Sequence, residues 1–320
     1  MIFISPNFMP KLPRVNQKGV TMVELIIAIV ITGILAGIIA VFIVRPMQGY
    51  VDLGRRAALV DSAESALRRM ARDIRIALPD SVRVNQAGGP GFVLELLPIL
   101  EGGMYRDGGG NEGGVAANNP SRLTGFGGGG DNEFDIHDVF RSSNIVVPST
   151  NNPHRLVINN IGSNTIGYNA YNPTLGPRGS VITPSNVTIN YAASNITNAT
   201  RIQLRVGANP APNHPFPQRS SGQRVYVITT PVTYLCDPAV GTLMRYDNYA
   251  IQSTQPTTAA VLSGLANVRV GLVADHVSTC SAAYGTGTIQ SRGLVSLDLT
   301  IEDQGEKIRL LHQVQVDNSP

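Results

Sequence analysis

The stretch Lys18-Gly19-Val20-Thr21-Met22-Val23-Glu24 decides how this chain is organised, because an unbroken apolar run begins inside it and continues to Val44. The run from Val20 to Val44 holds 25 residues, and Glu24 is its only strongly polar side chain. About 20 apolar residues are enough for a helix to cross the ~30 Å hydrocarbon core of a membrane. The run is therefore predicted to be a transmembrane helix with one carboxylate near its start.

Glu24 permits two interpretations. A charged side chain inside a membrane span costs roughly 3 kcal/mol, so an acid at this position indicates a function. Alternatively, Glu24 lies close enough to the start of the helix for its carboxylate to reach the membrane interface and to interact with the positive end of the helix dipole. The charge alone does not decide between these interpretations.

The residues at the start of the run resemble the type III signal of type IV prepilins and type II secretion pseudopilins. The resemblance consists of a basic residue, a Gly, an apolar residue, and a Glu five places after the Gly. It implies that a prepilin peptidase cleaves between Gly19 and Val20 and then methylates the new amino group of Val20. It also implies that Glu24 pairs with the Val20 amine of a neighbouring subunit during assembly. Val20 and Met22 are conservative departures from the Phe or Met and the Leu that are usual in this family.

The same resemblance implies an α+β, pilin-like fold in which a long N-terminal transmembrane helix packs on a β-rich head of antiparallel sheet. The expected parts are a leader (1–19), an assembly helix (20–44), the periplasmic half of the long helix (45–79), and the head (80–320). The implied partners are other major and minor pilins, prepilin peptidase, the inner-membrane pilus assembly platform, and membrane lipid before assembly. The implied location is the bacterial inner membrane with the head in the periplasm, and later the pilus at the cell surface.

Two further parts of the chain resemble the minor pilins of MSHA-type pili. These parts are residues 49–84 after the span, and the C-terminal segments 234–238, 292–295 and 311–320. The resemblance implies a structural subunit that acts in pilus assembly or initiation. A J-type minor pseudopilin of type II secretion and a tip adhesin with a ligand-binding head remain the alternatives.

Composition and charge exclude some functions. The chain has 320 residues, of which 15% are charged, and its formal net charge is +3. Lys11, Arg14 and Lys18 in the leader account for this charge, so the rest of the chain sums to zero and is not expected to bind nucleic acid electrostatically. The five histidines are scattered, and neither HExxH nor GxSxG occurs, so no enzyme activity and no cofactor are predicted.

The two cysteines, Cys236 and Cys280, are expected to form a disulfide if the head lies in an oxidising periplasm. Two buried free thiols are the alternative. Neither cysteine has a CxxC partner, so a structural zinc site is not expected. Pilin-like proteins often carry a C-terminal disulfide, and the resemblance therefore favours the bridge.

After the span, Pro46 is expected to bend the helix or to break it locally. The helix should then continue to Leu78, because apolar residues recur every seven positions, and Pro79 should end it. The recurring residues are Leu53, Val60, Leu67 and Ile74. The arginine-rich run that starts at Arg68 permits a nucleic-acid patch, but a solvated helix face with charge pairs four residues apart is the favoured interpretation.

The head is expected to contain short strands and long loops, the loops covering about residues 102–130 and 207–222. A polar cluster after the first loop has oxygen ligands that suit calcium, but its spacing does not match an EF-hand, so no metal is predicted. The cluster comprises Asp131, Asn132, Glu133, Asp135, His137 and Asp138.

Further strands are predicted from alternating apolar residues. They cover 155–159, 187–191, 201–206, 224–236 (interrupted or edged at Pro231), 268–272, 295–301 and 308–316. The last two are expected to form an antiparallel hairpin through the polar turn 302–306. His312 lies on the apolar side of the last strand and is expected to be partly buried and hydrogen-bonded.

Overall fold

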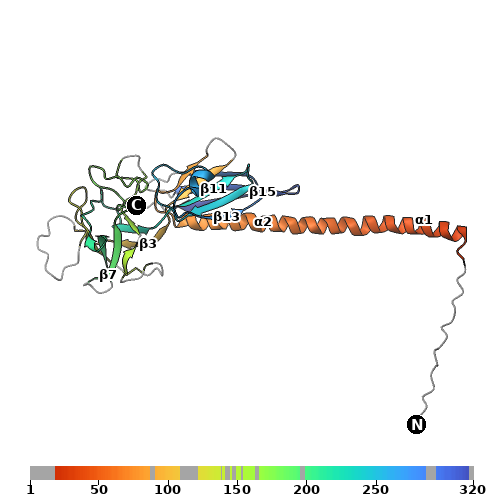
Figure 1. Ribbon diagram of the computed structural model, residues 1–320, viewed down its shortest axis with the longest axis horizontal. Helices are drawn as coiled ribbons and strands as arrows, with labels where there is room; N and C mark the ends of the chain where they lie inside the picture. The colour runs from red at the N-terminus through yellow and green to blue at the C-terminus, as the bar shows by residue number, and fades with distance from the viewer. Residues whose placement is uncertain are drawn as a thin grey trace, which may run out of the picture. The chain divides into compact units, whose positions relative to one another are not determined.

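A computed structural model describes most of the chain. The described residues are 19–86, 91–108, 122–137, 139–140, 145, 149–152, 154–162, 166–194, 199–285 and 293–316. The expected leader lies outside them except for Gly19. The chain divides into two compact units, residues 1–55 and residues 56–320 (Figure 1). The confirmed fold class is α+β, because a long apolar helix precedes a head of antiparallel sheets.

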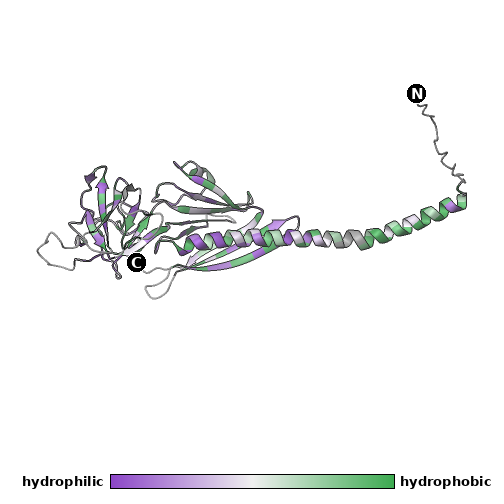
Figure 2. Ribbon diagram, turned by 90° about the horizontal axis from the view of Figure 1, so that it is seen from below, coloured by the Kyte–Doolittle hydropathy of each residue, from purple (hydrophilic) through white to green (hydrophobic). Residues whose placement is uncertain are grey.

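The described part of the first unit is helical. It contains α1 (Met22–Ile39), the π-helical segment η1 (Ala40–Val44), and the beginning of α2 (Arg45–Arg75). Figure 2 shows that α1 is predominantly hydrophobic. The π-helical segment lies next to Pro46, whose ring nitrogen has no hydrogen to donate to the carbonyl four residues back. The predicted local break in the α-helix is therefore confirmed, and it takes the form of a π-helical turn.

In the second unit, α2 buries one apolar face of its last five turns. The buried residues are Leu59, Ala63, Ala66, Leu67, Met70, Ala71 and Ile74. Leu53, which the predicted stripe included, is 68% exposed. The helix also ends at Arg75 and not at Leu78. The cause is backbone pairing, because the Leu78 amide donates to Leu97 over 2.7 Å and the Ile99 amide donates to Ile76 over 2.7 Å.

The part of the second unit that holds α2 is called the helix lobe. One of its sheets has the strand order β1-β2-β11-β12-β13 and the other has the order β14-β15-β16. Both sheets turn apolar side chains toward α2, and together they form one core with it. A short helix, α3, covers the opposite face of the first sheet through Leu262. The bounds are β1 (Arg83–Asn85), β2 (Phe92–Leu96), β11 (Val232–Asp237), β12 (Thr242–Asp247), α3 (Ala259–Ser263), β13 (Arg269–Ala274), β14 (Val277–Gly285), β15 (Gly293–Asp303) and β16 (Glu306–Val316).

The predicted C-terminal hairpin is confirmed. Strands β15 and β16 pair in antiparallel register, with Val295 opposite Val314 and Ile301 opposite Ile308. The turn has Gln304 and Gly305 at positive φ, 47° and 89°. Apolar side chains at every second position face α2, as expected for a sheet with one buried face.

The remaining part of the second unit is called the second lobe. It contains the sheets β3-β10-β6 and β4-β8-β7-β5, and β9 pairs with β8. The bounds are β3 (Ile99–Met104), β4 (Glu133–Ile136), β5 (Ser149–Asn152), β6 (Arg155–Val157), β7 (Thr188–Ala193), β8 (Thr200–Val206), β9 (Asn209–Pro210) and β10 (Arg224–Ile228).

The second lobe is an insertion into the helix lobe. The chain leaves the first sheet after β2 and returns to it at β11, and these two strands are neighbours with Leu96 opposite Val232. The apolar stretch 92–100 enters two sheets, because it divides into β2 and β3 at Pro98. The stretch 224–236 likewise divides into β10 and β11 at Pro231, which confirms the predicted interruption. Proline has no amide hydrogen for a ladder, so both division points are where a strand is expected to end.

The predicted bounds of the two long loops are partly wrong. Gly102 and Gly103 belong to β3, and residues 109–121 lie outside the described part of the chain. In the second expected loop, 207–222, which is rich in proline, His214 and Phe216 are buried. Gly179 has φ of 105°, and a Cβ there would lie 1.8 Å from the Pro215 carbonyl oxygen. The Gly127 amide also donates to the Phe216 carbonyl over 2.8 Å, so the segment 207–222 packs against both the glycine-rich turn and the segment around Gly179.

Candidate assembly site

Thr21 and Glu24 form a capping box at the start of α1. The Thr21 hydroxyl accepts a hydrogen bond from the Glu24 amide over 3.3 Å. The Glu24 carboxylate accepts one from the Thr21 amide over 3.0 Å and one from the Thr21 hydroxyl over 2.9 Å. Such a box satisfies amides that have no partner inside the helix. The carboxylate is therefore hydrogen-bonded by its own chain and lies at the positive end of the helix dipole.

The residues of the expected cleavage site lie just before this box. Gly19 and Val20 are exposed and precede the helix, and a Cβ built at Gly19 would meet no atom within 4 Å. The structure thus brings Gly19, Val20 and Glu24 together within two turns of the helix start, where the peptide bond after Gly19 is open to solvent. Cleavage, methylation and a role of Glu24 in assembly stay predictions.

Helix α1 and its continuation have the length and composition of a membrane anchor. Met22–Phe42 is long and apolar enough to cross a bilayer, and within the described residues no other helix meets this criterion. Its side chains are all exposed within the chain. Gly33 and Gly37 also have open space around them, as small residues need where helices approach closely in lipid. An apolar surface of this kind requires lipid or other helices to cover it.

An ion pair joins α2 to the first sheet. The Asp73 carboxylate accepts hydrogen bonds from the Tyr234 hydroxyl over 2.8 Å and from Arg245 Nε over 2.9 Å. Arg245 also pairs with Asp247, which in turn accepts from Arg269 Nε over 2.7 Å. Burial together with the hydrogen bond and charge of Asp73 raises the pKa of the Tyr234 hydroxyl. No sequence pattern indicates this ion pair, because the partners of Asp73 lie more than 160 positions away.

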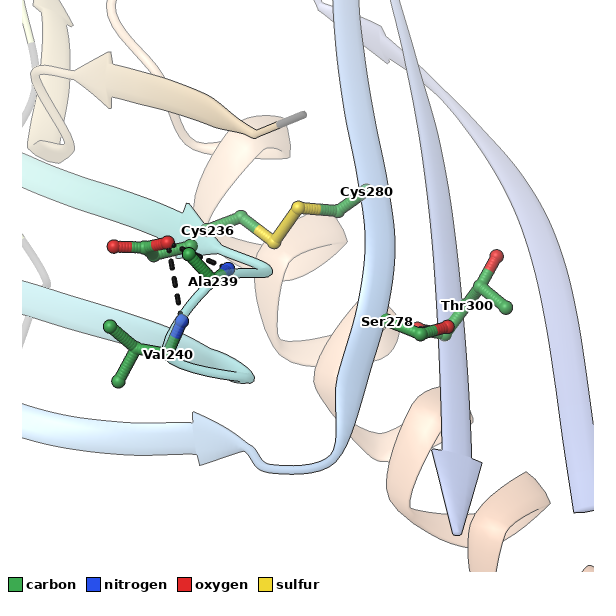
Figure 3. The surroundings of a disulfide bond; sticks show 7 residues. Cys236, Ala239, Val240, Ser278, Cys280 and Thr300 are labelled. Atoms are coloured by element: carbon green, nitrogen blue, oxygen red, sulfur yellow. Dashed lines mark hydrogen bonds between the residues drawn. A yellow bond between two sulfur atoms is a disulfide. The ribbon is translucent and has the colours of Figure 1, made fainter. Parts of the chain in front are cut away.

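The predicted disulfide is confirmed. Cys236 in β11 and Cys280 in β14 are bonded with their Cα atoms 6.6 Å apart, so the bridge ties the two sheets of the helix lobe together (Figure 3). Both cysteines belong to the core that contains α2. The adjacent turn is closed by the Asp237 carboxylate, which accepts from the amides of Ala239 and Val240.

The carboxylates considered as calcium ligands have protein partners instead. The Asp131 carboxylate accepts hydrogen bonds from the amides of Thr124 and Gly125, and so closes the glycine-rich turn that separates Gly125 from Asp131. Glu133 and Asp135 both pair with Arg201. Asp138 lies outside the described residues, and no group of three potential metal ligands occurs within them.

The histidines do not meet at one site in the described structure. His214 is 3% exposed, and its Nε2 lies 2.9 Å from the Ser180 carbonyl oxygen, so this nitrogen carries the proton. Burial lowers the pKa of His214 to about 4. His154 Nδ1 lies 2.9 Å from the Tyr191 hydroxyl. His312 is partly buried as expected, and its buried Nε2 has no hydrogen-bond partner among the described residues, so the expected hydrogen bond is not made by this nitrogen.

Comparison with known families finds a match at the start of α1. Residues 14–40 match the model of the prokaryotic N-terminal methylation motif, and this segment includes Gly19, Val20 and Glu24. The match supports a type IV pilin-like or pseudopilin subunit, which is a class of structural proteins that interact with other pilins and with prepilin peptidase. No curated protein and no solved structure matches the chain.

Proposed function

We propose that this chain is a minor pilin-like structural subunit of an MSHA-type IV pilus, in which it acts in assembly or initiation. The observation that carries the proposal is the methylation motif at residues 14–40, followed directly by an exposed apolar helix. The resemblance of residues 49–84 and of the C-terminal segments to the MSHA minor pilin MshO supports the MSHA assignment.

In this proposal, prepilin peptidase cleaves after Gly19 and methylates the amine of Val20. The anchored chain has its head in the periplasm and meets the pilus assembly platform in the inner membrane. The local capping box keeps the Glu24 carboxylate hydrogen-bonded in the single subunit. When α1 enters a bundle of other pilin helices, the Val20 amine of a neighbour replaces these partners, since an unpaired buried carboxylate would be costly.

Mass spectrometry of the amino terminus tests the processing step. The full chain, produced in a host with an active prepilin peptidase, is expected to begin with N-methylated Val20. An intact Met1 in the membrane fraction of such a host would contradict the proposal.

Glu24→Ala tests the assembly step. The variant is expected to remain in the membrane but to be absent from sheared surface filaments. Glu64→Ala is the matched control, because Glu64 is an exposed acid whose one ion pair among the described residues is with Arg68, four residues away. Equal incorporation of the two variants would remove Glu24 from the mechanism.

A minor pseudopilin of type II secretion is the second candidate, because the methylation motif is common to both groups. Surface filaments distinguish the two. Recovery of the chain from extracellular pili favours the pilus, whereas retention in the envelope together with a secretion defect on deletion favours the pseudopilus.

A further inference from the structure

The last two turns of α2 carry four exposed arginines opposite the buried face. They are the adjacent pair Arg68 and Arg69, followed by Arg72 and Arg75 at spacings of three or four positions that keep them on one side of the helix. Arg68 pairs with Glu64. The other three make no hydrogen bond or ion pair with any described residue. The favoured interpretation of a solvated helix face therefore holds for all four, whereas charge pairing within this group is found only at Arg68. These four residues are called the arginine stripe.

Three turns of the helix lobe gather into a surface of the opposite charge. The β11–β12, β13–β14 and β15–β16 turns are joined by backbone hydrogen bonds, from Val277 to Gly241 over 3.0 Å and from Glu302 to His276 over 2.8 Å. Their carboxylates are Asp237, Asp275, Glu302, Asp303 and Glu306, and Lys307 lies 3.5 Å from Glu302. This surface is called the acidic turn end.

The two surfaces lie at opposite ends of the helix lobe. The β15–β16 turn lies beside the earlier part of α2 within this lobe, whereas the arginine stripe lies where α2 ends (Figure 1, Figure 2). The two surfaces therefore do not meet in one copy. They can meet when a second copy is shifted along the helix direction, and a contact between two different surfaces repeats from copy to copy in an open helical assembly.

We propose that the arginine stripe is a docking surface for the acidic turn end of a second copy of this chain. The proposal rests on the proposed function as a filament subunit. Opposite charges steer the approach and fix the register of the contact, and like charges at the same places would oppose it. The favourable effect of arginines on a helix C-terminus falls off within the last turn, so it does not account for Arg68 and Arg69.

Crosslinking in membranes tests the contact with the full chain. One tagged copy carries Ile76→Cys beside the stripe, and a differently tagged copy carries Val240→Cys in the β11–β12 turn. Both positions are exposed, 46% and 70%, and neither substitution changes a charge. The native cysteines are bonded to each other and do not react with a bis-maleimide. The expected product is a doubly tagged dimer that forms only when both added cysteines are present.

Charge reversal decides whether the stripe causes this contact. Arg69→Glu with Arg72→Glu in the first copy should lower the dimer yield about tenfold. Asp275→Arg with Glu306→Arg in the second copy should then restore most of it. Arg178→Glu, an exposed site in the second lobe, is the control and should leave the yield unchanged.

Three outcomes would overturn the proposal. In the first, the dimer still forms when the stripe arginines are replaced by Glu. In the second, the dimer is lost in that variant and is not restored by the acidic-turn variant. In the third, the chain binds a DNA duplex through the arginine stripe and does not form the dimer. The amino terminus of the same samples is analysed by mass spectrometry. A methylated Val20 together with any of these outcomes shows that the docking proposal fails while the proposed function stands.

Discussion

The helix lobe and the second lobe form their cores in different ways. The helix lobe packs a one-sided helix between sheets with alternating apolar residues and closes them with a disulfide. The second lobe has short strands, and its glycine-rich and proline-rich segments contact each other through the backbone. The difference shows that one chain can obtain stability either from side-chain periodicity and a covalent bond, or from close backbone contacts and buried polar groups.

Removing the disulfide should show the largest difference between the lobes. The pair Cys236→Ala and Cys280→Ala opens a loop with a sequence separation of 44. The expected loss is about 4 kcal/mol in the free energy of unfolding, because the unfolded chain regains loop entropy. Hydrogen exchange of the full chain should show lost protection in β11 and β14 and retained protection in β7 and β8. An equal loss of hydrogen-exchange protection in both lobes would show that the disulfide also stabilises the second lobe, and would contradict the prediction.

Acid should weaken the second lobe through His214. The pKa of its imidazole is lowered from 6.5 to about 4 by burial, so the unfolded state binds the proton more readily. The stability that neutral His214 contributes is therefore fully present above pH 6.5 and is lost as the pH falls toward about 4. The expected loss is about 3 kcal/mol, since each unit of pKa corresponds to about 1.4 kcal/mol.

His214→Gln should flatten the dependence of second-lobe stability on pH, measured by denaturant unfolding between pH 7 and pH 4. His276→Gln is the control, because His276 is exposed at a turn of the helix lobe. An unchanged slope in His214→Gln would show that another group causes the acid sensitivity.

Replacing a glycine by alanine should destabilise the protein at a close backbone contact of the second lobe, but not in an open strand of the helix lobe. Gly179→Ala places Cβ against the Pro215 carbonyl at positive φ, and the expected destabilisation is about 2 kcal/mol or more. Gly271→Ala in β13 meets no atom within 4 Å and should have little effect. Thermal unfolding of the two variants measures the difference, and similar melting temperatures would refute the importance of the contact.

The smallest effect is expected at the exposed ion pair of Arg68 and Glu64. Glu64→Ala should change the free energy of unfolding by about 0.5 kcal/mol or less, because solvent screens the pair. A loss above 1 kcal/mol would mean that Glu64 contributes to the helix lobe in a way that its visible contacts do not explain.

Sequence patterns predict α1, the buried face of α2 and the C-terminal hairpin well, for physical reasons. A long apolar run, a period of 3.6 and strict alternation each require one kind of element, and the hairpin at Gln304 and Gly305 follows from them. The capping residues Thr21 and Glu24 are neighbours in sequence, so the motif contains the whole local site.

Alternation also predicts the second-lobe strands β6, β7 and β8, at 155–159, 187–191 and 201–206. The contacts between the irregular segments of that lobe and the helix–sheet ion pair could not be predicted in this way. Gly179 and Pro215 meet because two irregular segments cross, and no period indicates such a contact. Asp73 meets Arg245 across 172 positions, so its sequence neighbours gave no sign that it would be withdrawn from solvent. The division of 92–100 at Pro98 was similarly hidden, because an apolar run has the same composition whether it enters one sheet or two.

The pairing of Leu96 with Val232 has an evolutionary consequence. Since β2 and β11 are adjacent antiparallel strands, the ends of the inserted segment lie side by side, and a short hairpin turn could replace residues 98–231 without moving either strand. Related chains could therefore exchange the second lobe while keeping the same helix lobe. A chimaera with a foreign domain grafted at Leu97 should still fold around α2.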